Sequence, residues 1–232
     1  MIFFENTTFI LFLTVALYSI GLFLTTKYKM IIFNPIILST MILMAYCIVL
    51  KVPYEKYEEA GQYIDFFLKP SIVALAIPLY LQWDKIKKQL LPIIFSQLVG
   101  CIIGILSVVV IAKLCGAEKE IILSLAPKSV STPIALEVSS SLKGIPSITA
   151  AAVIITGIFG SMVGFRLLNL SRITKPMSQG IAMGTSSHAL GTMKALQISD
   201  KYGAFASVGM IFNGILTAIL APIILDFLKV YL

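Results

Sequence analysis

Two stretches of the chain combine polar side chains with an apolar surrounding, and the first carries the groups needed to bind an organic anion. It runs over residues 127–133 (PKSVSTP), between Pro127 and Pro133, with Lys128 as a cation and with hydroxyls at Ser129, Ser131 and Thr132. An ammonium group, hydroxyls and the amide groups at the start of a helix all favour a negative charge. We therefore expect this stretch to bind a carboxylate. In the alternative, Lys128 extends to lipid headgroups and the hydroxyls bond to their own helix.

The second stretch is GTSSHALGT, residues 184–192, which holds the only histidine, His188. Its candidate ligand contacts are Ser186, Ser187, His188, Gly191 and Thr192. Because an imidazole titrates near neutral pH, His188 could couple a proton to transport. Alternatively, it is a neutral side chain that donates a hydrogen bond to a neighbouring helix. Glu137 is a second candidate for coupling, since it could neutralise Lys128 or accept a proton.

Enzymatic chemistry is not indicated by the sequence. The single histidine has no acidic residue near it in the chain, and no phosphate-binding loop occurs. Cys47, Cys101 and Cys115 lie in or at the end of apolar runs, without a Cys-x-x-Cys pair or clustered histidines. We therefore expect a protein that is not an enzyme and that has no metal site and no cofactor.

The composition is that of a protein whose solvent is the lipid bilayer. Of the 232 residues, 58% are hydrophobic and only 12% are charged, and the mean hydropathy is +0.97. A soluble domain would carry about 25% charged residues. The net charge of +7 comes mostly from Lys and Arg in short loops, where they contact headgroups. This placement argues against a nucleic acid partner.

About eight apolar segments are each near the length that crosses a bilayer, and we expect all of them to be helical. The fold class predicted is therefore all-α, a polytopic membrane helical bundle, with one transmembrane domain over residues 1–232. A β-barrel is rejected because runs such as Cys101–Ala112 do not alternate. The predicted segments are 7–26, 31–50, 63–82, 90–113, 120–141, 147–170, 177–197 and 203–230.

Prolines, glycines and polar residues interrupt the segments at 63–82, 120–141 and 177–197, which predicts broken or re-entrant helices. Residues 68–79 and 125–136 match at five of twelve positions, which suggests an internal repeat. Paired interruptions of this kind point to a transporter site. Segment 120–141 either crosses the bilayer or is re-entrant, and both topologies stay open.

Long motifs in the chain resemble the LrgB/CidB family of bacterial membrane proteins. They are LAPKSVSTPIALEVSSSLKGIPSITAAAVIITGIFGS and GIAMGTSSHALGTMKAL, and KPSIVALAIPLY is similar to the family's PATVALAVPLY. The likeness covers nearly the whole chain and departs at Lys69 and Ser71, where the family usually has Gly and Ala or similar small residues. The motif residues that carry over are Pro127, Lys128, Ser129, Thr132, Pro133, Ser186, His188, Gly191 and Thr192.

The resemblance implies two functions. In one, the protein is a secondary transporter or facilitator of small monocarboxylates similar to glycolate, glycerate or pyruvate, as plant and some bacterial relatives are. In the other, it is an antiholin-like regulator of murein hydrolase export and lysis that acts with a holin-like LrgA/CidA-type partner. We expect a multi-pass protein of the cytoplasmic (inner) membrane. The glycines of segments 90–113 and 147–170 leave a homodimer open.

Overall fold

The computed structural model describes residues 5–28, 33–67, 70, 73 and 76–228. Every regular element in these ranges is a helix, and they contain no strand. The prediction of an all-α protein is therefore confirmed for the described part of the chain. The helices form two compact units, Met1–Ala74 and Leu75–Leu232, and each is described by itself.

The first unit contains α1 (Thr7–Tyr28), α2 (Pro35–Leu50) and α3 (Tyr54–Asp65). Both α2 and α3 pack against α1. Ile10, Val52 and Ala60 form the small buried cluster of this unit. Gly21 allows the closest approach of α1 and α2, since a Cβ at this position would lie 2.7 Å from the Pro35 Cα. About half of the side chains of α1 and α2 are exposed in the structure and few are buried, as expected of helices whose outer faces meet lipid.

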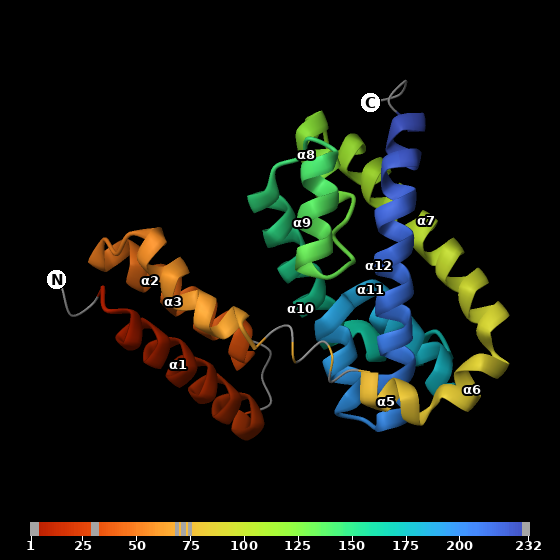
Figure 1. Ribbon diagram of the computed structural model, residues 1–232, viewed down its shortest axis with the longest axis horizontal. Coiled ribbons are helices and arrows are strands. Elements are labelled where there is room, and N and C mark those ends of the chain that lie inside the picture. The colour runs from red at the N-terminus through yellow and green to blue at the C-terminus, as the bar shows by residue number, and fades with distance from the viewer. Residues whose placement is uncertain (1–4, 29–32, 68–69, 71–72, 74–75, 229–232) are drawn as a thin grey trace. The chain divides into compact units, whose positions relative to one another are not determined.

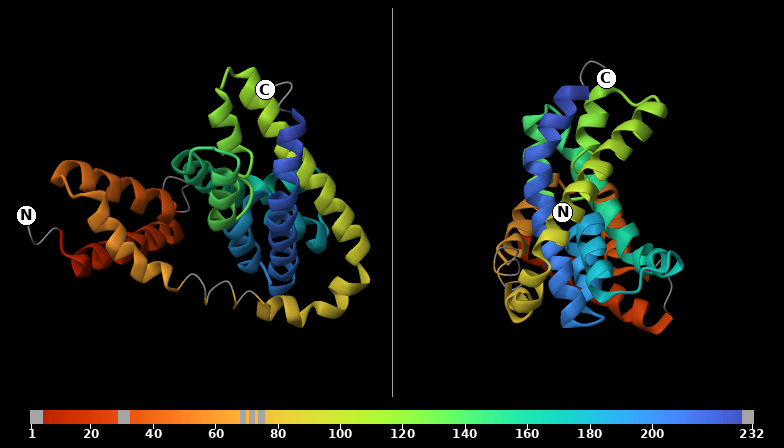
Figure 2. Two further views of the ribbon diagram at one scale, coloured as in Figure 1. Left: turned by 45° about the horizontal axis from the view of Figure 1, so that its top comes forward. Right: turned by 90° about the vertical axis from the view of Figure 1, so that its right-hand side faces the viewer.

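The second unit holds the remaining helices, and α12 (Asp200–Leu228) runs through its middle (Figure 1). In chain order the others are α5 (Ala76–Leu81), α6 (Trp83–Lys88), α7 (Leu90–Leu114), α8 (Lys119–Leu125), α9 (Thr132–Ser141), α10 (Pro146–Leu170) and α11 (Pro176–Leu196). α12 contacts α5, α7, α9 and α11. Figure 2 shows α7 beside α12 in two further views. This unit therefore brings together helices from both predicted polar stretches.

The most extensive packing in the chain joins α11 to α12. Residues 197–199 are all that separate these helices, so they lie side by side as an antiparallel pair. Small residues let the two backbones touch: a Cβ on Gly184 would lie 2.7 Å from the Ala206 carbonyl carbon, and one on Gly209 would lie 2.5 Å from the Ile181 carbonyl oxygen. Such close approach is the usual way in which helices associate within lipid.

Among the helices that the structure describes, four are long and apolar enough to cross a membrane, namely α1, α7, α10 and α12. The predicted count of about eight crossings is not confirmed. α2 is apolar but shorter. The internal repeat is not confirmed either, because residues 68, 69, 71, 72, 74 and 75 of its first copy lie outside the described residues. Lys69 and Ser71, the departures from the family pattern, fall in the same gap.

Two of the non-helical places in the second unit interrupt predicted apolar segments. Residues 126–131 separate α8 from α9. Pro133 belongs to the first turn of α9, where a proline costs no hydrogen bond. In α11 the backbone is kinked at Ser187 (φ −130°, ψ 16°) and His188 (φ 41°, ψ −132°). The two polar stretches of the sequence coincide with these places.

Candidate functional site

A pocket of about 910 Å³ opens into the second unit and is lined by α7, α10, α11, α12 and the 126–131 turn. Its walls are mostly apolar, with Ile93, Ile105 and Ile181 among the buried members. The polar side chains on its surface are Ser96, Gln97, Lys128, Ser129, Thr156, Ser178, Thr185, Ser186, Ser187, Asn213 and Thr217. An apolar cavity with a few convergent polar groups is the usual form of a small-molecule site.

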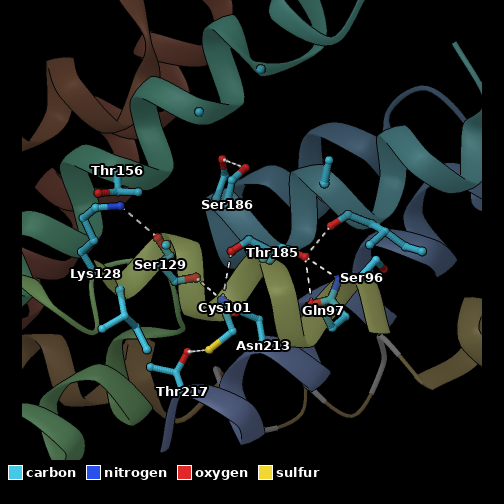
Figure 3. A pocket seen from close by; sticks show the side chains of 18 of the residues that line it. Ser96, Gln97, Cys101, Lys128, Ser129, Thr156, Thr185, Ser186, Asn213 and Thr217 are labelled. Carbon is cyan, nitrogen blue, oxygen red and sulfur yellow. Dashed lines mark hydrogen bonds between the residues drawn. The ribbon is translucent and has the colours of Figure 1, made fainter. Parts of the chain in front are cut away.

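Lys128 supplies the positive charge of the pocket. Its ammonium donates to the Ser129 hydroxyl at 3.0 Å, and Figure 3 shows the two beside Thr156. The ion pairs that join two described residues are Lys56–Glu59 and Lys87–Asp84. Lys128 therefore has no carboxylate partner among the described residues, and the predicted neutralisation by Glu137, an exposed residue of α9, is not seen. A cation in this state favours an anionic ligand.

Gln97 and Thr185 form a polar pair on the opposite side of the pocket from Lys128 (Figure 3). The Thr185 hydroxyl lies 2.7 Å from the Ile181 carbonyl oxygen, which can only accept, so the hydroxyl donates to it. The Gln97 amide nitrogen then donates to the same hydroxyl oxygen at 2.7 Å. This pair fixes α11 against α7 at the pocket wall.

Asn213 of α12 lies between these two ends. Its amide nitrogen is 3.2 Å from the carbonyl oxygen of Ser129 and 3.0 Å from that of Thr185. These bonds join α12 to the 126–131 turn and to α11. Nearby, the Cys101 thiol lies 3.4 Å from the Thr217 hydroxyl.

His188 lies behind the pocket wall and not on it. The ring is buried, and its Nε2 is 3.0 Å from the Val153 carbonyl oxygen of α10. Because a carbonyl oxygen only accepts, Nε2 carries a hydrogen and donates it. A Cβ on Gly157 would lie 2.5 Å from the His188 Cε1, so this glycine makes room for the ring. The contact agrees with the alternative of a histidine bonded to a neighbouring helix, and proton coupling at His188 or Glu137 stays a prediction.

The pocket brings together four of the predicted ligand contacts: Lys128, Ser129, Ser186 and Ser187. It does not include Pro127, Ser131, Thr132, Pro133, His188, Gly191 or Thr192 in its lining. Pro127 is buried within the turn, and the Thr192 hydroxyl donates to the His188 carbonyl oxygen at 2.9 Å. Their role as ligand contacts stays a prediction.

Gln97, Thr156 and Thr185 line the pocket but were not among the predicted ligand contacts. The sequence does mark Gln97, as an amide inside the apolar run 90–113. Thr185 lies in the polar stretch 184–192, although it was not named as a contact. Thr156 carries no such signal, because threonine is common in membrane helices as a packing residue.

The chain matches the LrgB-like family over residues 14–227. It belongs to the LrgB-like family. Among LrgB-like relatives, the uncharacterized protein YxaC of Bacillus subtilis is 36% identical over 93% of this chain and 94% of its own length. The holin-like protein CidB of Staphylococcus epidermidis is 34% identical, over 92% of this chain and 93% of its own length. CidB of Staphylococcus aureus strain Mu50 is 33% identical over the same shares. No solved structure matches the chain significantly.

The resemblance to the LrgB/CidB family predicted from the motifs is therefore confirmed. Membership together with four membrane-length apolar helices makes the chain a multi-pass membrane protein. The resemblance implied two functions, transport and a holin-associated role. The names of the CidB relatives favour the holin-associated role.

Proposed function

We propose that this LrgB-like protein binds small organic monocarboxylates in the pocket and carries them across the membrane, as a secondary transporter or facilitator and not as an enzyme. The observation that carries the proposal is the Lys128 ammonium on the wall of a pocket of about 910 Å³, with a hydroxyl and no carboxylate among its described partners. A lysine in this setting is costly unless it serves a ligand or an ion pathway.

The surrounding groups support a carboxylate as that ligand. Ser129, Ser186 and Ser187 are hydroxyl donors on the same pocket, and hydrogen bonds to a carboxylate are stronger than those between neutral groups. The apolar wall leaves room for a short carbon chain. Substrates similar to glycolate, glycerate or pyruvate meet these requirements, since each has one carboxylate and a small body.

Uptake into proteoliposomes tests the proposal. Purified wild-type protein is expected to take up radiolabelled glycolate or pyruvate with saturation, and Lys128→Ala is expected to lose this uptake while its elution in gel filtration is unchanged. Lys194→Ala is the matched control, since Lys194 is exposed at the end of α11 and donates to Gln197 at 3.2 Å. Full uptake by Lys128→Ala would defeat the proposal.

A second function is favoured by the names of the CidB relatives. In it, the protein is an antiholin-like component that regulates murein hydrolase export and lysis together with a holin-like LrgA/CidA-type protein. The same liposomes separate the two functions. Leak of unrelated solutes without saturation, or activity that appears only after a holin-like partner is added, would support the second function over the first.

Location in the cytoplasmic (inner) membrane and assembly as a homodimer belong to this proposal as well. Ile103 and Val110 on α7 support the dimer, because both are exposed and lie outside the pocket lining, so a second helix has room to pack on this face. Cross-linking of Ile103→Cys in membranes, with Cys47, Cys101 and Cys115 replaced by serine, would show a band at twice the monomer mass if α7 meets its copy.

A further inference from the structure

Asn213 uses both hydrogens of its side-chain amide on backbone carbonyl oxygens. The nitrogen lies 3.2 Å from the Ser129 oxygen and 3.0 Å from the Thr185 oxygen. Carbonyl oxygens only accept, so these contacts identify the NH2 group without ambiguity. The side chain is 3% exposed, and its position inside the protein leaves it little freedom to exchange these partners for water.

The two carbonyl groups lie in the 126–131 turn and next to the α11 kink. Ser129 is in the turn between α8 and α9, directly after Lys128. Thr185 is two residues before the kink at Ser187. A third element, α12, therefore ties the turn that carries the cation to the kink that carries the Ser186 and Ser187 hydroxyls (Figure 3).

Such a tie has a physical reason. Backbone groups outside a regular helix lack the ladder of hydrogen bonds that fixes a helix, and in lipid each unsatisfied carbonyl is costly. The Ser129 carbonyl lies in a turn. The Thr185 carbonyl lies next to the kink, which disturbs the regular backbone hydrogen bonds of α11. One amide satisfies both groups and at the same time sets the distance between them.

We propose that Asn213 is a positioning residue, whose amide couples the 126–131 turn to the α11 kink so that Lys128 and the serine hydroxyls face one ligand. The functional part of this inference rests on the proposed carrier role of the pocket. The structural part does not, because the coupling of the two stretches is a property of the protein without ligand. Asn213 itself acts through Ser129 and Thr185.

Hydrogen–deuterium exchange of the purified protein in nanodiscs tests the coupling without any transport. Asn213→Ala is expected to raise exchange about tenfold at the amides of residues 126–131 and, together with them, at residues 186–190, because losing a buried hydrogen bond lowers the cost of local opening. Exchange in α7 and α10 stays as in the wild type. Asn169→Ala is the matched control, since Asn169 accepts from Gln179 at 2.5 Å and lies outside the pocket.

Asn213→Asp tests whether the NH2 group matters or only the volume of the side chain. Aspartate has the same size, but its carboxylate oxygens cannot donate to the Ser129 and Thr185 carbonyl oxygens. It is expected to exchange at least as fast as Asn213→Ala in both stretches. In liposomes, both variants are expected to raise the KM for a monocarboxylate about tenfold, with the maximal rate within about twofold, because pre-organisation of the site is what they lose. Wild-type exchange in either stretch, or a wild-type KM for Asn213→Asp, would overturn the inference. Absence of saturable uptake by the wild type would instead defeat the carrier proposal. The hydrogen–deuterium exchange result alone would then decide whether Asn213 couples the turn to the kink.

Discussion

Gly160 of α10 lies directly against Ser187 of α11, at the residue where α11 is kinked. A Cβ built on Gly160 would overlap the Ser187 hydroxyl and stand 2.8 Å from the Ser187 Cβ. No ordinary Cβ contact is this short, so any side chain at position 160 must displace Ser187. Since both residues line the pocket, the shape of the kink and the shape of the site depend on the same contact.

Gly160→Ala is therefore expected to destabilise the protein by about 1–3 kcal/mol, the usual cost of inserting a methyl group into a packed interior. Thermal unfolding in detergent micelles measures this as a lower Tm. Gly104→Ala provides the control: Gly104 lines the same pocket but has nothing within 4 Å of its Cβ position, and alanine is the better helix former. A Tm for Gly160→Ala equal to that of Gly104→Ala would show that α10 and α11 do not touch in this way.

Gln97 and Thr185 should behave as a coupled pair. Gln97→Leu or Thr185→Val alone removes one partner of a hydrogen bond at a site where Gln97 is only 1% exposed, which costs about 1–3 kcal/mol. The double variant leaves no unpaired group from this bond, so it should be less destabilised than the sum of the single variants by about 1 kcal/mol.

Unfolding of the four proteins of this double-mutant cycle measures the coupling energy. The exposed pair Lys194–Gln197, whose bond is 3.2 Å long, is the comparison and should give a coupling near zero. Additive costs for Gln97 and Thr185 would mean that their bond does not hold α7 to α11.

The helices could be predicted from the sequence because their signal is local. The apolar runs expected at 90–113 and 147–170 correspond to α7 (Leu90–Leu114) and α10 (Pro146–Leu170) within one residue at each end. Crossing a bilayer requires a fixed length of apolar chain, and that length can be read directly. The proline-rich stretch likewise coincides with the interval between α8 and α9, although Pro133 lies in the helix that follows because a first-turn proline needs no donor.

The pocket could be predicted only in part, because its walls join residues that are far apart in the chain. Lys128 stood out as a cation in an apolar run, whereas the role of Asn213 depends on carbonyl groups in two other elements. A single sequence contains no information on which turn lies beside which helix. For the same reason, His188 looked like a ligand contact beside its serines, although its ring turns away to α10.

Cys101 offers a native reporter of ligand binding in the pocket. It is the only one of the three cysteines that lines the pocket, and Cys115 is exposed elsewhere. In a protein with Cys47→Ser and Cys115→Ser, a short monocarboxylate is expected to slow labelling of Cys101 by N-ethylmaleimide at least threefold, because the occupied pocket excludes the reagent. The neutral amide of the same acid should give little protection.

Lys128→Ala in the same background is expected to abolish the protection while leaving the rate of labelling without ligand similar. Mass spectrometry of the intact protein follows the modification. Equal protection by the acid and its amide would argue that the pocket recognises size and not charge, and would remove the role assigned to the ammonium.

His188 has a backbone conformation that glycine adopts more easily than any other residue, with φ 41° and ψ −132°. Replacing it by alanine or by glycine removes the bond from Nε2 to the Val153 carbonyl equally, but only alanine keeps the strain of a Cβ at positive φ. His188→Gly should therefore be more stable than His188→Ala by about 1 kcal/mol, after allowance for the greater freedom of glycine in the unfolded chain. The next residue, Ala189, has helical backbone angles, so there alanine is the more stable residue and glycine the less stable one. Ala189→Gly should therefore lower the free energy of unfolding by about 1 kcal/mol. Thermal unfolding of the three variants compares the two positions directly, and a His188→Gly protein less stable than His188→Ala would mean that α11 continues through this residue as a regular helix.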